Sequence, residues 1–216
     1  MRKKLLCLTC LLVLAGCENT PIKKAEPQAA VVTTPIESPL DREIKSLLEK
    51  GISMSERKRQ VSAIEVAFTR RTTPQRARQL AALCFTKTLS TPFMPFDLAE
   101  IALAETGGSR LSAVAVSSKG AVGVWQLMPQ RARSHGYTPQ DMENDEKCAE
   151  AAVRELFTKL EVAAGNLERA KKLYCGQGPQ ANAYLRKIRH VRQEMLAELE
   201  HQTERLAMEE SGTKTP

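Results

Sequence analysis

Aromatic residues are scarce in this chain. They make up 4% of its 216 residues, whereas hydrophobic residues of all kinds make up 42%. The core must therefore consist mainly of Ala, Leu, Val and Ile side chains. Such a composition favours helices over a β-sandwich, whose strands are enriched in aromatic residues. We therefore expect a mainly α-helical protein.

Metal-binding and phosphate-binding motifs are lacking as well. The histidines His135, His190 and His201 are scattered, and no His, Cys or Asp cluster has the spacing of a metal site. Gly176-Gln177-Gly178 does not follow a predicted strand, so it is not a phosphate loop. We expect neither a metal nor another cofactor.

A strong charge of one sign is missing too. The formal net charge is +7, and the first three basic residues lie in a segment that we expect to be removed. The mild excess that remains indicates a solubilised surface or weak attraction to an anionic polymer. We expect no nucleic-acid partner.

The N-terminus has the pattern of an export signal. Basic residues at 2–4 precede an apolar stretch at 5–14, which is too short to span a membrane. The run Leu14-Ala15-Gly16-Cys17 that follows resembles the bacterial lipobox, which implies that Cys17 is diacylated and becomes the new N-terminus. Two acyl chains give a stable membrane anchor. Glu18 does not match the Asp retention signal of similar proteins, so we expect the periplasmic face of the outer membrane rather than the inner membrane.

Composition and periodicity divide the chain into five segments. These are a lipoprotein signal peptide at 1–16, a disordered tether at 17–40, a helical region at 41–73, a larger helical domain at 74–190, and a charged helix with a tail at 191–216. The tether is rich in Thr, Ala, Pro and Lys, and the tail is predicted to be disordered beyond Met208.

Cap residues and apolar spacing mark the helices. We expect helices that begin at Thr73-Pro74, Pro95, Asn144 or Asp145, Asn166 and Pro179, preceded by one around Ile44, Leu47 and Leu48 and one that starts at Ser53. Residues 111–126 lack helical spacing and predict a loop with short strands. The last helix carries a heptad-like apolar stripe, which predicts packing on its own domain or pairing with another helix.

Three cysteines remain after removal of the signal peptide and acylation of Cys17. They are Cys84, Cys148 and Cys175, and they would face an oxidising compartment. One disulfide and one free thiol is the simplest expectation, and the sequence does not choose the pair.

One carboxylate lies where a carboxylate is unfavourable. Glu105 follows Leu98, Ile101 and Ala102 at helical spacing, so it falls on the apolar face of the helix that begins at Pro95. Desolvation and the negative end of the helix dipole would both raise its pKa, as suits a general acid at neutral pH. The alternative is a frayed helix end with Glu105 in water.

The surrounding motifs resemble the lytic transglycosylase (SLT-type) family. Glu105-Thr106 is followed by a loop and by the run Ala115-Val116-Ser117-Ser118-Lys119-Gly120-Ala121-Val122-Gly123-Val124-Trp125-Gln126-Leu127-Met128-Pro129. Further motifs are Tyr174-Cys175-Gly176-Gln177-Gly178 and Tyr184-Leu185-Arg186-Lys187-Ile188. The resemblance covers about Arg76 to Arg189. It implies a lysozyme-like (goose-type/SLT) helical domain with a small loop and β region at the active site.

The resemblance also implies roles for individual residues. Glu105 would be the general acid and base, and Ser117 would help to hold the reacting sugar. The remaining candidates for substrate binding are Gln126 by hydrogen bonding, Met128 by packing, Tyr184 beside the glutamate, and Tyr174, which is more often a packing residue. Trp125 suits the core as well as a sugar platform.

The chain departs from the family pattern at three places. Thr106 replaces the usual Ser, the loop at 107–114 is about three residues longer than usual, and Cys175 replaces an Asn. The loop change puts the substrate contacts in doubt, and the Asn replacement puts full activity in doubt unless a disulfide through Cys175 stiffens the region.

The expected function is non-hydrolytic cleavage of the MurNAc–GlcNAc bond in peptidoglycan glycan strands, which leaves 1,6-anhydroMurNAc ends. Glu100 lies away from the catalytic face, and residues 107–126 contain no acid, so a second catalytic carboxylate is lacking. Two alternatives stay open: a muramidase that uses water, and a catalytically weak glycan-binding scaffold of an envelope-spanning machine. The sequence does not separate wall turnover from a role beside a secretion or conjugation apparatus.

Overall fold

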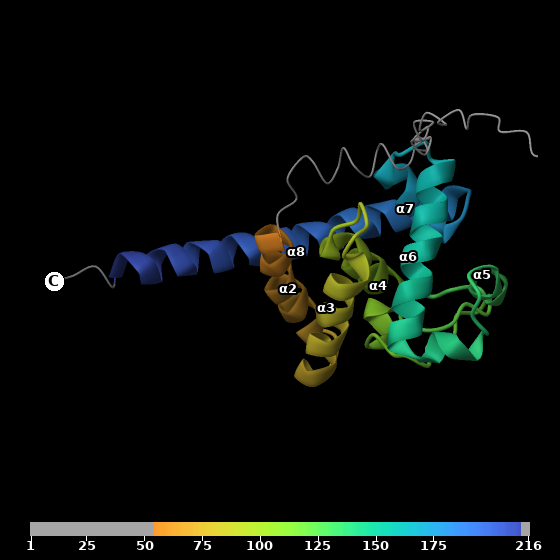
Figure 1. The fold of residues 1–216 in the computed structure, drawn as a ribbon, viewed down its shortest axis with the longest axis horizontal. Coiled ribbons are helices and arrows are strands. Elements are labelled where there is room, and N and C mark those ends of the chain that lie inside the picture. The colour runs from red at the N-terminus through yellow and green to blue at the C-terminus, as the bar shows by residue number, and fades with distance from the viewer. Residues whose placement is uncertain (1–53, 213–216) are drawn as a thin grey trace, which may run out of the picture. The chain divides into compact units, whose positions relative to one another are not determined.

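The computed structural model describes residues 54–212, and this part is mainly helical (Figure 1). The α-helices are α2 (Met54–Thr69), α3 (Pro74–Thr88), α4 (Pro95–Thr106), α5 (Pro129–Ser134), α6 (Asp145–Val162), α7 (Leu167–Cys175) and α8 (Pro179–Gly212), with 3₁₀-helices at η1 (Gly107–Ser109) and η2 (Gln140–Glu143). The expected fold class is confirmed. Within 54–212 the expected β region is limited to two isolated antiparallel bridges, Val116–Val122 and Val122–Leu127.

Local capping explains where several helices begin. The side chains of Asn144 and Asn166 accept hydrogen bonds from the backbone amides of Lys147 (3.0 Å) and Arg169 (2.9 Å). Such bonds satisfy amides that have no partner inside the first helical turn. Thr73 caps α3 in the same way and is followed by a proline in the first turn. The N-terminal boundaries expected at Thr73-Pro74, Pro95, Asn144 and Asn166 are therefore confirmed.

The central helix α4 contacts α2, α3, α6 and α8. Every residue of α4 is buried except Glu105, which is partly exposed. The helix is thus buried on all sides rather than along a single apolar stripe, because neighbouring helices cover its whole circumference. In its last turn α4 reaches the protein surface at Glu105.

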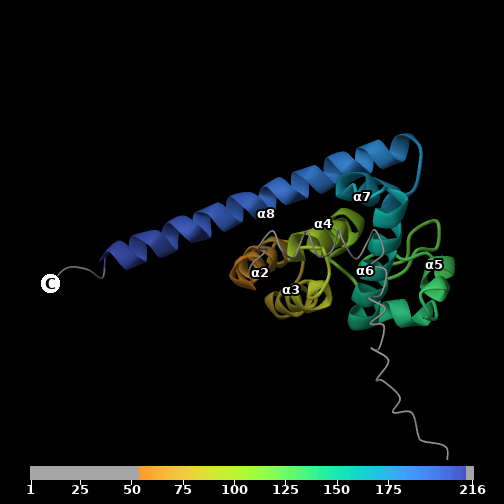
Figure 2. The same ribbon diagram turned by 45° about the horizontal axis from the view of Figure 1, so that its top comes forward.

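The last helix is longer than the sequence suggested. We expected disorder beyond Met208, but α8 continues to Gly212. No proline interrupts this stretch, and hydrogen bonds from Thr203 Oγ1 to Leu199 O and from Gln202 Nε2 to Glu198 Oε1 support the helix. Both ribbon views show α8 passing α4 and α2 and extending beyond them (Figures 1 and 2).

The apolar stripe of α8 packs mainly on its own domain. Tyr184, Ile188, Val191 and Met195 are all buried, and α8 contacts α2, α4 and α7. Leu206 is exposed on the part that extends beyond the other helices. The predicted packing of the stripe on its own domain is therefore confirmed from Tyr184 to Met195.

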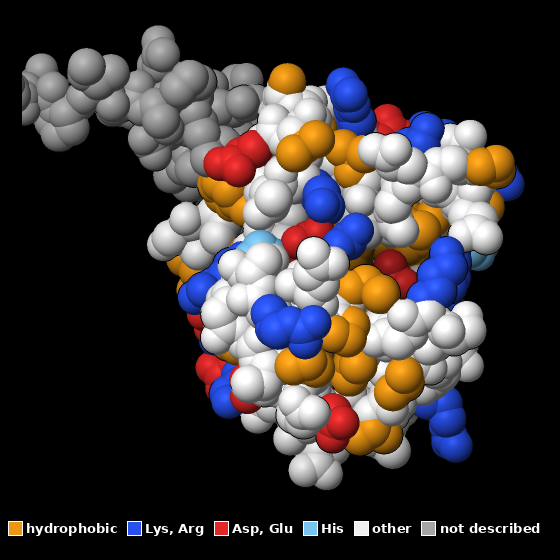
Figure 3. Space-filling view, turned by 90° about the vertical axis from the view of Figure 1, so that its right-hand side faces the viewer, with side chains coloured by type: hydrophobic (Ala, Val, Ile, Leu, Met, Phe, Trp, Pro, Cys, Tyr) orange, Lys and Arg blue, Asp and Glu red, His pale blue; other side chains and the backbone are white. Residues whose placement is uncertain are grey.

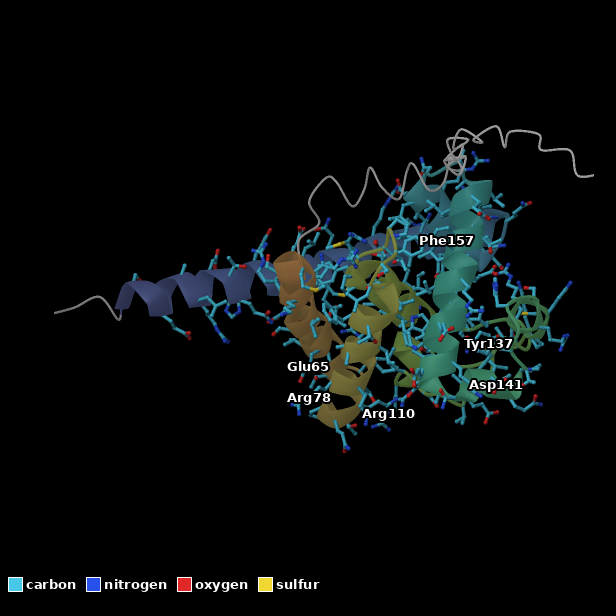
Figure 4. All side chains as sticks on the ribbon, in the orientation of Figure 1. Glu65, Arg78, Arg110, Tyr137, Asp141 and Phe157 are labelled. Carbon is cyan, nitrogen blue, oxygen red and sulfur yellow. The ribbon has the colours of Figure 1, made fainter. Side chains whose placement is uncertain are left out.

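Side-chain contacts also connect the remaining helices (Figure 4). Glu65 of α2 and Arg78 of α3 form an ion pair of 3.2 Å on the surface. Phe157 of α6 packs edge-on against Phe93, with 5.8 Å between the ring centroids. The aromatic contact joins α6 to the segment that leads into α4, and it therefore helps to hold the helix that carries Glu105.

The disulfide expectation was wrong for the cysteines that the structure describes. Cys84, Cys148 and Cys175 are all free thiols. Cys84 and Cys148 are buried in the core and Cys175 is exposed, so the side chains lie in different environments. A stiffening disulfide through Cys175 is therefore absent.

Several predictions fall on residues outside the described range. They concern the signal peptide, Cys17, the tether, the helix expected around Ile44 and the cap at Ser53. The helix expected to follow Ser53 is confirmed as α2. Among residues 54–212, no helix has the length and hydropathy needed to cross a membrane.

Candidate active site

Glu105 occupies the last turn of α4, at the boundary between core and solvent. Burial raises the pKa of its carboxyl from 4.5 to about 7, against the opposing effects of Tyr184, Lys187 and Arg131. Near neutral pH, the protonated acid and the carboxylate of Glu105 are therefore both populated. A group in this state can donate a proton and accept one. The sequence-based expectation of a raised pKa agrees with this environment, and the frayed-end alternative does not.

Helix α8 brings two polar groups to this carboxyl. The Tyr184 hydroxyl is buried and has no partner at hydrogen-bonding geometry, yet it lies close enough to lower the pKa of Glu105. Lys187 follows one turn later, and its ammonium group donates a hydrogen bond to Ala104 O at the end of α4. Tyr184 thus lies near Glu105, and the substrate-binding role that the family resemblance implied for it stays a prediction.

Sequence reasoning missed Lys187 and Arg131. Lys187 stands three residues after Tyr184, and residues at this spacing share a helix face, so the signal was present. Arg131 gave no such signal. Its Nη1 donates a hydrogen bond to Tyr174 O (2.7 Å), and its charge lowers the pKa of Glu105.

Ser117 and Gln126 stabilise the loop of residues 111–126, which was predicted from the sequence. The amide of Ala121 donates to Ser117 Oγ (3.0 Å), and the amide of Ser117 donates to Ala121 O (2.9 Å). Gln126 Nε2 donates to Ala115 O (3.0 Å) and Gly123 O (2.8 Å). The amide nitrogen of Gln126 is therefore engaged in fixing the loop, whereas the Ser117 hydroxyl hydrogen can still be donated.

Gly123 lets this loop approach the rest of the domain closely. Its φ is +84°, and a Cβ atom there would lie 2.2 Å from Met142 O and 2.8 Å from Cys148 Sγ. Both the conformation and the space therefore require glycine. The loop therefore packs closely against Met142 of η2 and Cys148 of α6 at Gly123.

Trp125 and Tyr174 belong to the core. Trp125 is fully buried, and its Nε1 donates to Leu98 O of α4 (2.9 Å). The Tyr174 hydroxyl donates to Trp125 O (2.9 Å). Together these bonds tie the loop to α4 and α7. The placement of Tyr174 supports its packing role and not the expected substrate contact, since its hydroxyl is already engaged.

Thr106 and Met128 complete the loop's attachments. Thr106 Oγ1 donates to Val124 O (2.7 Å). Thr106 stands where the family has Ser and keeps the hydroxyl, and this bond connects the residue next to Glu105 with the loop. Met128 is partly exposed and precedes the first turn of α5. Its expected role in lining the cleft stays a prediction.

Residues 84–189 match the family model described as Transglycosylase SLT domain. Residues 84–189 are therefore similar to the SLT transglycosylase domain family. No curated protein and no solved structure matches the chain. The mainly helical architecture of residues 54–212 is consistent with the lysozyme-like fold of this family. The match contains all of α4, the loop and the part of α8 that bears Tyr184 and Lys187.

Cys175 is the last residue of α7 and lies within the matched residues. Burial and the charge of Glu105 raise the pKa of its thiol. The thiolate is the nucleophilic form of cysteine, so a raised pKa keeps the group unreactive at neutral pH. We therefore assign Cys175 no catalytic role.

Four charged side chains, three of them buried, form a network between α4, α7 and α8. Lys171 of α7 pairs with Asp97 (2.6 Å) and with Glu100 of α4, and Arg192 of α8 pairs with Glu100 (2.6 Å) and Asp97. Burial raises the pKa of Glu100 despite these cations, whereas Lys171 and Arg192 outweigh burial at Asp97 and lower its pKa. Removing one member would leave buried charges without a partner.

Glu100 is therefore not an innocuous surface residue. The sequence placed it away from the catalytic face, and it points to α7 and α8 rather than to Glu105. Since its side chain is fully buried, a Glu100 variant would test packing rather than chemistry. For a Glu105→Gln variant, the exposed Glu161 on α6 is therefore a better site for a matched Glu→Gln control than Glu100 is.

The described residues contain no group of three or more His, Cys, Asp or Glu side chains that could hold a metal ion. The polar groups that act on the pKa of Glu105 are a phenol, an ammonium group and a guanidinium group.

Proposed function

We propose that this protein cleaves the β-1,4 bond between MurNAc and GlcNAc in peptidoglycan without water and leaves 1,6-anhydroMurNAc ends. One observation carries the proposal: in the SLT domain, the one incompletely buried residue of the central helix is Glu105, and its pKa is raised to about 7. A carboxyl with this pKa suits both proton transfers of the reaction.

In the proposed reaction, protonated Glu105 donates its proton to the glycosidic oxygen as the bond to C1 of MurNAc breaks. The N-acetyl group of the same sugar supports the positive charge that develops at C1. The Glu105 carboxylate then takes the proton from the C6 hydroxyl, whose oxygen attacks C1 and closes the anhydro ring. Glu105 ends protonated, as it began, and no water is consumed.

The groups around Glu105 support both stages. Tyr184, Lys187 and Arg131 all favour the carboxylate, so they stabilise the state formed after the first proton transfer. Burial favours the acid, which is the state needed before bond cleavage. These opposing effects leave the pKa near neutrality instead of far above it.

Hydrolytic glycosidases commonly use a second carboxylate to activate water or to form a covalent intermediate. No acidic residue occurs between Gly107 and Gln126, and Asp97 and Glu100 are engaged by Lys171 and Arg192. This distribution favours the reaction in which the substrate's own C6 hydroxyl is the nucleophile.

Digestion of purified sacculi with the protein tests the proposal. Mass spectrometry should find muropeptides that end in 1,6-anhydroMurNAc, which borohydride cannot reduce. Glu105→Gln should lose on the order of 10²–10⁴ in rate or more, because glutamine transfers neither proton. Glu161→Gln, on an exposed position of α6, should cleave like the wild type.

Two other results would each replace the proposal. Reducible MurNAc ends would show that water is the nucleophile and would identify a muramidase. Intact sacculi that nevertheless bind the wild-type protein would identify a glycan-binding scaffold.

We further propose that the protein acts from the periplasmic face of the outer membrane, held by lipid on Cys17. The support is the lipobox-like run that ends at Cys17, together with a polymer substrate that lies beside that membrane. The predicted tether at 17–40 would give the SLT domain reach from the anchor to the wall.

A further inference from the structure

The end of α8 is a helical segment that its own domain does not cover. From Thr203 onward, every side chain of α8 that the structure describes is exposed, and Leu206 and Met208 are 56% and 70% exposed. Both ribbon views show this end extending beyond α2 (Figures 1 and 2). In proteins, most helical stability comes from tertiary packing of an apolar face. The described residues do not supply such packing to the end of α8, so this segment suits a partner.

A groove of about 320 Å³ lies beside this segment, between α2 and α8. Its apolar part is formed by Val66 of α2 and by Leu199 and Leu206 of α8. Leu199 and Leu206 are seven residues apart, about two helical turns, so they lie on one face of α8. This face continues the apolar stripe whose first part packs on the domain. The groove is therefore where the stripe leaves the core and becomes accessible.

The groove and the end of α8 differ in charge. Arg59 of α2 and Arg205 of α8 line the groove. The acidic lining residue, Glu198, is already paired with Arg70 of its own chain (3.0 Å). By contrast, residues 200–209 contain three glutamates and one arginine. An arginine-lined groove beside an acidic tip is electrostatically complementary to a second copy of the same surface.

The packing of α8 restricts how a second copy can approach. Up to Met195, the apolar face of α8 is buried on its own domain. A parallel partner helix would run along this covered part and would bring both domains to the same end. An antiparallel partner overlaps only the exposed end, because its own domain lies beyond the tip of α8. The geometry therefore favours an antiparallel pair with its two-fold axis near Gln202, which lies between Leu199 and Leu206 in the helix.

We propose that the end of α8 joins two copies of this chain in an antiparallel pair, in which Leu206 of each copy enters the groove between α2 and α8 of the other. One two-fold axis places Leu206 of one copy against Leu199 of the other and repeats the contact symmetrically. It also brings each acidic tip to the arginines of the other groove. The inference does not depend on the proposed reaction, because Tyr184 and Lys187 lie near the other end of α8.

A head-to-tail contact is the alternative arrangement of the same chain. The space-filling view from the side of α5, α6 and α7, away from the tip of α8, shows Lys and Arg side chains at several places, which would attract an acidic tip (Figure 3). Ion pairs between exposed side chains contribute little free energy, whereas burial of a leucine contributes more. The two-fold pair is therefore favoured, since it buries the apolar stripe. A head-to-tail contact that does not close would instead give growing chains of molecules.

A cysteine at the proposed two-fold axis tests the arrangement directly. Gln202→Cys places a thiol beside its own copy across the axis, where two Cα atoms come within the range of a disulfide. His201→Cys is the matched control, because His201 is exposed and does not line the groove. Both are made in the full-length chain with Cys175→Ser, which removes the exposed thiol among the described cysteines, and are purified in detergent.

The readout is electrophoresis without reductant after mild oxidation. Gln202→Cys should run mainly as a covalent dimer, whereas His201→Cys and the parent chain should run as monomers. Equal cross-linking at the two positions, or none at position 202, would overturn the pairing.

Sedimentation equilibrium of the full-length chain measures the strength of the pair. Leu206→Lys puts a charge at the apolar contact and beside the arginines of the other groove. Met208→Lys is the matched control, because Met208 is also exposed but lies on the opposite face of α8. Burial of one leucine corresponds to about tenfold in affinity or more, and the change acts at both symmetric contacts. Leu206→Lys should therefore weaken the dimer by about a hundredfold, and Met208→Lys should leave it nearly unchanged.

Thermal melting should show that both lysine variants are folded, since both positions are exposed. A wild type that stays monomeric at every concentration would overturn the proposal and assign the groove to another occupant. Equal weakening by the two variants would overturn it as well, and so would assemblies that grow beyond a dimer, as the head-to-tail contact predicts.

Discussion

Replacing Glu105 by glutamine should stabilise the fold in a way that depends on pH. The folded-state pKa of Glu105 is about 7, raised by burial from the ordinary value of 4.5. Between these two values the unfolded chain has released its proton while the folded protein retains it. The free energy of unfolding therefore falls as pH rises through this window, and the loss is complete above pH 7. Glutamine does not ionise, so the variant escapes this loss.

The size of the effect follows from the same two pKa values. Since one pKa unit corresponds to about 1.4 kcal/mol, the pKa difference of Glu105 lowers the free energy of unfolding by about 3 kcal/mol at pH 8 and by about 1 kcal/mol at pH 5, relative to a group with the same pKa in both states. For a protein of this size, 1 kcal/mol shifts Tm by roughly 2–4 °C. Glu105→Gln should thus melt several degrees above wild type at pH 8, with a much smaller difference at pH 5.

Thermal melting of wild type, Glu105→Gln and Glu161→Gln across this pH range is the assay. Glu161 is exposed, so its variant should follow the wild type at every pH. Equal Tm differences between Glu105→Gln and wild type at pH 5 and pH 8 would refute the reasoning, because the carboxyl would then titrate alike in the folded and unfolded chains. Stabilisation together with lost cleavage would mark a site whose function opposes its stability.

The other predictions concern the neighbours of Glu105 and the anchor. Lys187→Met removes a cation that lowers the pKa of Glu105, so the fall of kcat/KM on the alkaline side should move to higher pH; an unchanged pH profile would contradict the coupling. Tyr184→Phe should shift that fall in the same direction, since the hydroxyl it removes favours the Glu105 carboxylate; an unchanged pH profile would show that the hydroxyl does not act on Glu105. Cys17→Ser should leave a soluble or uncleaved precursor on membrane fractionation, and an unmodified Cys17 peptide from the mature protein would disprove the anchor.

Local signals sufficed for much of the fold. Thr73, Asn144 and Asn166 are caps whose bonds join residues three apart, and proline at 74 and 95 fixes a first helical turn. Such interactions lie within one turn of chain, so a single sequence reveals them. The extent of α8 beyond Met208 was missed because a charged surface helix and a charged coil have similar compositions.

The candidate site, too, could be predicted from the sequence only in part. Glu105 could be chosen from its helix and its motif, but the roles of Gln126 and Tyr174 depend on partners from other segments. Gln126 holds the loop through Ala115 and Gly123, and Tyr174 is engaged by Trp125. A motif shows which residues recur together, whereas only the packed chain shows which polar atoms are already bonded.

By itself, the sequence determined the helical class, most helix starts, and the carboxyl at the end of a helix that must be buried. The tertiary structure decided how strongly that carboxyl is desolvated, which charges act on it and whether the cysteines pair. Lys187 and Arg131 reach Glu105 from α8 and α5, and Glu100 is buried between Lys171 and Arg192. These effects depend on distances between segments that are far apart in the chain. A pKa responds to such distances, and a sequence pattern does not contain them.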